Sequence, residues 1–141
     1  MAKKVTLVFL LLLLAWFTIF ITGLSIGDAV FAERDFDVVT IVWWVLYIGC
    51  VVLFLAKPKI GQYVCTVFQF LWIIMQSLNF FASPSGIAHY NDLFKDTHHI
   101  MAPSDTFLIP DTAHLILLTL LLLSFAAMIV FIVTSWKSKT K

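Results

Sequence analysis

Charged residues are scarce in this chain. They make up 12% of the 141 residues, and hydrophobic residues make up 62%. A soluble domain carries about 25% charged residues. A domain of about 150 residues also buries only about 70% of its surface, so a water-soluble fold could not hide this much apolar surface. The shortage of charge excludes a soluble globular protein and predicts that lipid surrounds most of the chain.

Four long runs contain no Asp, Glu, Lys or Arg: 5–26, 38–56, 60–81 and 113–136. Each has close to the roughly 20 residues that a helix needs to cross a hydrocarbon core of about 30 Å. Helices satisfy their own backbone polar groups, as a bilayer requires. The sequence therefore predicts an all-α integral membrane protein of four transmembrane helices, forming a single domain over residues 1–141.

Acidic residues are missing from every segment on one side of the predicted bundle. If the chain alternates across the membrane, the basic residues on that side are Lys3, Lys4, Lys57, Lys59, Lys137, Lys139 and Lys141. The other side holds all eight acids, which are Asp28, Glu33, Asp35, Asp37, Asp92, Asp96, Asp105 and Asp111. Lysines are retained near short cytoplasmic segments, so we expect both termini in the cytoplasm and insertion in the plasma membrane. The first run is longer than the apolar core of a secretory signal, so we expect an uncleaved span.

The connections between the spans are short, with one exception. Pro58 cannot continue the second helix, so the turn at 57–59 predicts an antiparallel hairpin of the second and third spans. The external loop 82–112 is long enough to have structure of its own. Ser83 and Pro84 form a helix-start signal, and residues 87–101 separate into an apolar and a polar face. We expect an amphipathic helix there that lies on the membrane or caps the bundle and ends before Pro103.

Cysteine is nearly absent, which excludes a disulfide framework. The two that occur, Cys50 and Cys65, flank the cytoplasmic turn within predicted spans. Thiols on the reducing side of a membrane usually stay reduced, and an apolar cysteine is usually a small buried side chain. We expect two structural thiols, with a redox pair as the alternative.

One pattern in the external loop could carry metal chemistry. His89, Asp92, Asp96 and His99 follow spacings of three, four and three, which would put them on one face of a helix. Two imidazoles and two carboxylates suit a divalent transition metal. The alternatives are a solvated polar face or a face that docks a partner, because an amphipathic helix must place polar residues on its wet side.

The third span carries a stripe of polar residues, made up of Gln62, Thr66, Gln69, Gln76 and Asn79. Polar side chains inside a membrane turn toward another helix, where their hydrogen bonds stabilise packing. The stripe is therefore a candidate partner-binding surface, and its alternative role is to hold the bundle itself together. No Asp, Glu, Lys or Arg lies within the spans, which disfavours a solute pathway.

These observations favour a non-enzymatic small membrane subunit or accessory protein that packs against a larger membrane partner or assembles with its own copies. No resident cofactor and no nucleic-acid partner is expected. The alternative is a metal-binding membrane protein or metal-dependent membrane enzyme that uses the external His/Asp cluster.

Overall fold

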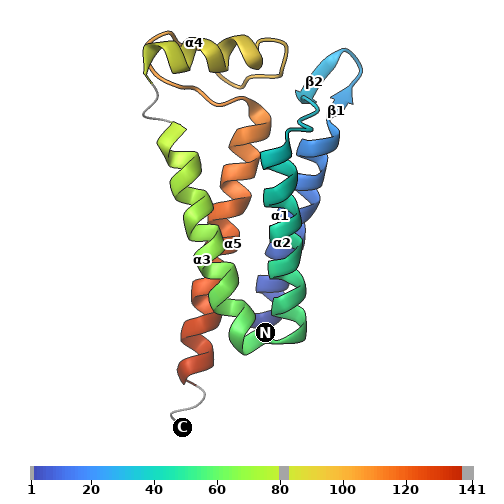
Figure 1. Ribbon diagram of the computed structural model, residues 1–141, viewed down its shortest axis with the longest axis vertical. Coiled ribbons are helices and arrows are strands. Elements are labelled where there is room, and N and C mark those ends of the chain that lie inside the picture. Colours follow the sequence, from blue (N-terminus) through green and yellow to red (C-terminus); the bar gives the residue numbers. More distant parts are fainter. Residues whose placement is uncertain (1, 80–82, 138–141) are drawn as a thin grey trace.

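The computed structural model describes residues 2–79 and 83–137. Its elements follow one another in the order shown in Figure 1, and most of the chain is helical. They are α1 (Ala2–Thr22), β1 (Leu24–Ile26), β2 (Ala29–Ala32), α2 (Val38–Ala56), α3 (Pro58–Asn79), α4 (Pro84–Leu93) and α5 (Thr112–Lys137). Residues 80–81 of the predicted third span, the side chain of Asn79, and Lys139 and Lys141 lie outside the described residues.

Among the described helices, α1, α2 and α5 are long and apolar enough to cross a membrane. The helix α3 has 22 residues, which is also sufficient length. Its lysine, glutamine and serine side chains make it less apolar than the other three. Three membrane-compatible helices are therefore present, and the fourth crossing, through α3, stays a prediction.

The first predicted span was wrong at its outer end. The helix α1 stops at Thr22, and the chain then turns through Gly23, whose φ of +82° favours glycine. Residues that the apolar pattern assigned to the span instead form β1, which pairs antiparallel with β2. The fold thus adds a small β-hairpin to the expected helices.

The hairpin of α2 and α3 forms where Pro58 predicted it. A single residue, Lys57, separates the two helices. Immediately afterwards, Gly61 brings α3 against the backbone of α2, because a Cβ at this position would lie 2.4 Å from the Cα of Phe54. Glycine is required here for its small size, and the close approach fixes how the two helices leave the turn.

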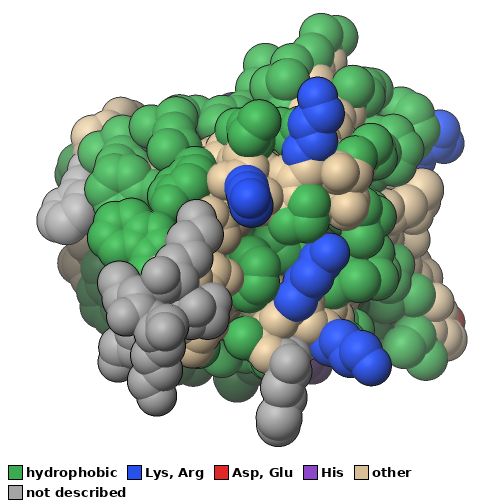
Figure 2. Space-filling model, turned by 90° about the horizontal axis from the view of Figure 1, so that it is seen from below, with side chains coloured by type: hydrophobic (Ala, Val, Ile, Leu, Met, Phe, Trp, Pro, Cys, Tyr) green, Lys and Arg blue, Asp and Glu red, His purple; other side chains and the backbone are tan. Residues whose placement is uncertain are grey.

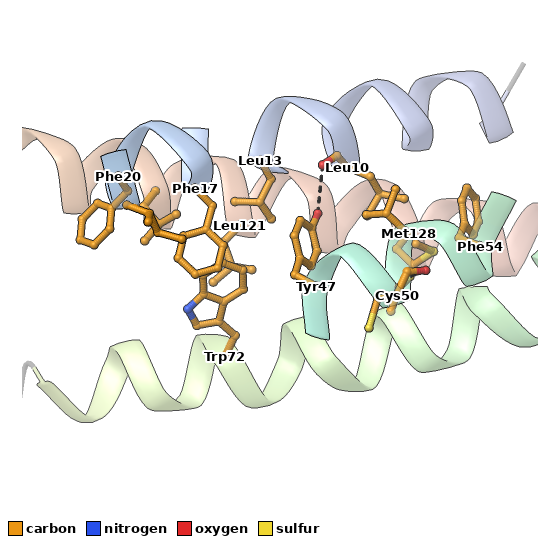
Figure 3. Packing of buried hydrophobic residues seen from close by; sticks show 14 of the residues in the cluster. Leu10, Leu13, Phe17, Phe20, Tyr47, Cys50, Phe54, Trp72, Leu121 and Met128 are labelled. Atoms are coloured by element: carbon orange, nitrogen blue, oxygen red, sulfur yellow. Dashed lines mark hydrogen bonds between the residues drawn. The ribbon is translucent and has the colours of Figure 1, made fainter. Parts of the chain in front are cut away.

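The core of the bundle lies between all four long helices. The helix α5 packs along α1 and α3, and α2 packs along α3 and more loosely along α1. Figure 3 shows the inner residues meeting at the centre, with Trp72 of α3 reaching toward Phe17 of α1 at a ring-centroid distance of 4.7 Å. Outward-facing side chains such as Val45, Leu71 and Leu122 are exposed, as lipid-facing residues should be.

The end of the bundle that carries β1, β2, α4 and the segment 94–111 is called the cap (Figure 1). Its parts are joined by an isolated parallel bridge between Val30 and Thr97 and by a 2.7 Å hydrogen bond from the backbone N–H of His98 to the carbonyl of Val30. The rings of Phe31 and His98 stack at 4.9 Å. The two loops that connect the long helices at this end therefore form one layer.

The helix α4 corrects the expected extent of the amphipathic helix. It begins as predicted, with Ser83 capping the N–H of Gly86 and Pro84 in the first turn. It ends at Leu93, and not just before Pro103. The reason is the bridge to β2, because Thr97 pairs with Val30 and its hydroxyl donates to the carbonyl of Phe94 at 2.7 Å. A helical path would break both contacts.

The opposite end of the bundle is basic, and it is called the lysine end. Figure 2 shows Lys and Arg side chains spread over this face. Lys3 and Lys4 at the start of α1 and Lys57 and Lys59 at the hairpin are all exposed there. The acids lie in the cap and in the segment 33–37 that joins β2 to α2, so the charge asymmetry in the sequence is also an asymmetry between the two ends of the folded bundle.

Candidate functional site

The polar stripe of α3 turns largely into the chain's own bundle. Gln62 is 6% exposed and its amide donates to the carbonyl of Lys59 at 3.3 Å. The hydroxyl of Thr66 donates to the carbonyl of Gln62 at 2.6 Å. Gln76 is half-buried and lies near the cap end. The side chain of Asn79 lies outside the described residues.

Gln69 is the deepest member of the stripe. It is fully buried, and its amide nitrogen donates to the hydroxyl of Ser124 on α5 at 2.7 Å. Its other amide atom, Oε1, has no hydrogen-bond partner among the described residues. Beside this pair, Tyr47 of α2 donates its hydroxyl to the carbonyl of Leu10 on α1 at 3.1 Å (Figure 3). Polar contacts thus link α2 to α1 and α3 to α5 in the middle of the bundle.

The contact between Gln69 and Ser124 joins two helices, which is the alternative role of the stripe, whereas the contacts of Gln62 and Thr66 stay within α3. A side chain as buried as Gln62 or Gln69 is not available to a second protein unless the bundle opens. Burial therefore removes Gln62 and Gln69 from the surface of the bundle, and partner binding through the stripe stays a prediction.

The two cysteines lie where α2 and α3 approach each other near the lysine end. Both are buried and neither forms a disulfide. The thiol of Cys65 donates to the carbonyl of Cys50 at 3.1 Å. This contact ties the two helices together and suits the expected structural role.

The four predicted metal ligands are dispersed by the early end of α4. His89 and Asp92 are exposed on the helix, and Asp92 forms a 3.3 Å ion pair with Lys95. Asp96 and His99 lie beyond the helix, and Nδ1 of His99 is 2.9 Å from the carbonyl oxygen of Thr97. In the part of the chain that the structure describes, no three His, Cys, Asp or Glu side chains form a group that could hold a metal. The helical face that motivated the metal site is absent, and metal binding itself stays a prediction.

A cavity of about 220 Å³ lies between the helices just below the cap. Each of the four long helices contributes to its wall, together with Asp35 from the segment before α2. The lining residues are Phe17, Phe20, Asp35, Val39, Thr40, Trp43, Trp72, Met75, Gln76, His114 and Leu117.

The cavity has a buried inner wall and an exposed rim. Phe17, Trp72 and Leu117 on the inner wall are at most 4% exposed. Val39 of α2 is 60% exposed and Met75 of α3 is 50% exposed. The cavity therefore runs from the surface between α2 and α3 toward the faces of α1 and α5, at a level where the helices meet the cap.

His114, which lines this cavity, forms an imidazole–carboxylate pair with Asp111. Nδ1 of His114 lies 2.6 Å from Oδ1 of Asp111, and the same carboxylate oxygen accepts the backbone N–H of His114 at 2.9 Å. Burial raises the pKa of Asp111, but its hydrogen bonds and charge interaction with His114 outweigh burial and hold that pKa below its usual value. The carboxylate is ionised at neutral pH, so Nδ1 must be the donor in this contact.

Aromatic rings surround His114 and fix its orientation. Phe20 of α1 and Phe94 beyond α4 each lie 4.8 Å from the imidazole, in edge-on arrangements. Tyr90 of α4 lies 5.6 Å away, and its hydroxyl accepts the backbone N–H of Asp111 at 3.4 Å. Burial and the neighbouring carboxylate of Asp111 raise the pKa of Tyr90, so its hydroxyl stays neutral. The cap thus holds the imidazole from above.

Sequence reasoning missed this pair, although a signal for it exists. In the sequence, Asp111 is one of the eight acids on one side of the predicted bundle, and His114 is the second residue of the run 113–136. The spacing Asp-x2-His at a helix N-terminus permits a contact between i and i+3. The cavity beside the pair has no local signal, because its walls come from four helices far apart in sequence.

No family model, no curated protein and no solved structure matches this chain.

Proposed function

We propose that this protein is a small accessory subunit with four membrane crossings, which packs against a larger membrane partner through its cap. Both termini lie in the cytoplasm in this proposal, and the cap faces the outside of the plasma membrane. The charge asymmetry supports this orientation, because Lys3, Lys4, Lys57 and Lys59 are exposed at one end. The acids lie in the segments at the other end, together with Arg34 and Lys95.

The observation that carries the partner proposal is the set of large apolar side chains that the cap exposes beyond the long helices. From the end of α4 onward they are Leu93 at 53%, Ile100 at 65%, Met101 at 62% and Phe107 at 59% exposure. Lipid explains exposed apolar residues along α1, α2 and α5, but these four lie in connecting segments outside those helices. Exposed apolar groups of this kind mark sites of contact with a protein or a membrane surface.

The burial of Gln62 and Gln69 favours the cap over α3 as the contact surface. Gln69 already has a partner in Ser124 of the same chain. A partner that binds the cap needs no rearrangement of the bundle, whereas one that binds Gln69 must first separate α3 from α5.

Co-purification in mild detergent tests the proposal. We expect Ile100→Ser combined with Met101→Ser to reduce recovery of the partner while membrane insertion and thermal stability stay unchanged. Asp92→Ser, an exposed polar position on α4, is the matched control and should retain the partner.

Three outcomes would contradict the proposal. Recovery of the same partner with the double variant would show that the cap does not bind it. Quenching of fluorophores at positions 101 and 107 by lipid headgroup probes, without a co-purifying protein, would assign the apolar side chains to the membrane surface. Recovery of only differently tagged copies of this chain would establish a homo-oligomer in place of a larger partner.

A further inference from the structure

The cavity below the cap has the size of a single substituted ring. Its volume is about 220 Å³, and a dry apolar cavity of about 150 Å³ is already sufficient to bind benzene. Its inner wall consists mainly of flat or apolar side chains, namely Phe17, Phe20, Trp72 and Leu117. Aromatic side chains favour stacked and edge-on contacts with another ring. The size and the inner wall therefore fit a ring.

The opening of the cavity gives access from the side of the bundle. Val39 and Met75 form an exposed rim between α2 and α3, and both residues belong to long helices whose outer faces are apolar. A molecule dissolved in the bilayer could place its ring inside the cavity and leave an apolar tail between these two helices. The ligand need not pass through water.

His114 supplies the polar contact. Its Nδ1–H is taken by the ionised carboxylate of Asp111 at 2.6 Å, so in the neutral imidazole the other nitrogen, Nε2, carries a lone pair and accepts. Within the described part of the chain Nε2 has no hydrogen-bond partner. His114 lines the cavity, so a ligand with an O–H donor in the cavity lies next to the imidazole that carries this acceptor.

The charges around the cavity favour a neutral ligand over an anion. Asp35 lies at the wall, and its carboxylate accepts the hydroxyl of Thr40 at 2.9 Å and the backbone N–H of Asp37 at 3.1 Å. Asp111 is ionised behind the imidazole. Two carboxylates near one small cavity would repel a fatty-acid headgroup, whereas a hydroxyl avoids this cost.

We infer that this cavity is a binding site for a lipid-soluble molecule with a phenol-like ring, whose hydroxyl donates a hydrogen bond to Nε2 of His114. The ring occupies the aromatic inner wall and the tail leaves between α2 and α3. This site goes beyond the accessory role proposed above and uses a different surface, so either proposal can fail without the other.

Titration calorimetry on the full chain in lipid nanodiscs tests the site with two probes that differ only in the hydroxyl, 4-propylphenol and propylbenzene. We expect saturable binding of both, with 4-propylphenol about fivefold tighter, which is the effect of one net hydrogen bond. Equal affinities, or no saturable binding, would overturn the inference. So would tighter binding of benzyltrimethylammonium or hexanoate, because either would assign the site to a charged ligand.

Two variants separate the hydroxyl contact from the shape of the cavity. His114→Asn retains a donor toward Asp111 but removes the acceptor at Nε2, so 4-propylphenol should bind only as well as propylbenzene. Leu117→Phe fills the inner wall and should weaken both probes at least tenfold. Leu122→Phe, at an exposed position of the same helix, is the matched control and should change neither affinity.

The wild-type protein provides a readout that does not depend on how the variants fold. With histidine labelled by ¹⁵N, 4-propylphenol should shift the Nε2 resonance of His114 and propylbenzene should leave it in place. A resonance that responds equally to both probes, or to neither, would refute the hydrogen bond.

Discussion

For the Gln69–Ser124 contact we predict that removing Ser124 destabilises the protein more than removing Gln69. Ser124→Ala deletes the hydroxyl that accepts from the amide nitrogen of Gln69, a side chain that is fully buried. The amide nitrogen of Gln69 would then lose this partner in a largely apolar interior that also holds the hydroxyl of Tyr47. We expect a loss of about 1–2 kcal/mol in the free energy of unfolding, the range found for interhelical hydrogen bonds and for unsatisfied buried groups.

Gln69→Leu should cost much less. The substitution removes Oε1, which has no hydrogen-bond partner among the described residues. Leucine also has nearly the same helix propensity and a similar volume. The hydroxyl of Ser124 that remains can bond to a carbonyl of its own helix. We expect a change within about 0.5 kcal/mol in either direction.

A double-mutant cycle gives the coupling directly. Adding Ser124→Ala to Gln69→Leu should cost little, so the coupling energy should be about 1 kcal/mol. Reversible unfolding in mixed micelles, followed by tryptophan fluorescence, measures all three variants. If Gln69→Leu proves as destabilising as Ser124→Ala, or the coupling is zero, the two side chains do not hold α3 to α5 in the way described.

Two other perturbations test the turn and the cap. Gly61→Ala should destabilise the hairpin by about 1–3 kcal/mol, because its Cβ would lie 2.4 Å from Phe54 Cα, whereas Gly49→Ala meets nothing within 4 Å and should be neutral or stabilising in the same assay. Burial raises the pKa of Asp111, but contacts with His114 lower that pKa more, so it lies below its usual value in the folded protein. The Asp111 carboxylate should therefore stabilise the fold above about pH 3.9, the usual pKa. This stabilisation should be lost as the pH falls through the lower pKa of the folded state. Asp111→Asn should remove this part of the acid dependence of the melting temperature, and an identical profile for both proteins would contradict the pairing.

Local signals in the sequence located most of the helices. The helix start at Ser83 and Pro84 and the hairpin at Pro58 depend on neighbouring residues, and both are confirmed. The end of α4 depends on a distant residue, because Thr97 pairs with Val30, and helical periodicity cannot register such a contact. The metal pattern relied on that periodicity beyond Leu93.

For a related reason, the sequence could not predict which helix the polar stripe of α3 contacts. A glutamine inside a membrane turns toward some helix, and the sequence does not say whether that helix belongs to the same chain. Ser124 on α5 answers the question for Gln69. The cavity beside His114 could not be predicted from the sequence at all, because its walls form only when α1, α2, α3 and α5 pack together.

The central claim is that α3 crosses the membrane, so that the lysine end and the cap face opposite sides. Single cysteines at positions 59 and 105, in a background of Cys50→Ala and Cys65→Ala, test it with a membrane-impermeant thiol reagent on intact cells. We predict that the cysteine at 105 reacts at once and that the cysteine at 59 reacts only after the membrane is permeabilised. Reaction of both cysteines from the same side would show that α3 does not cross, and would contradict the four-span arrangement.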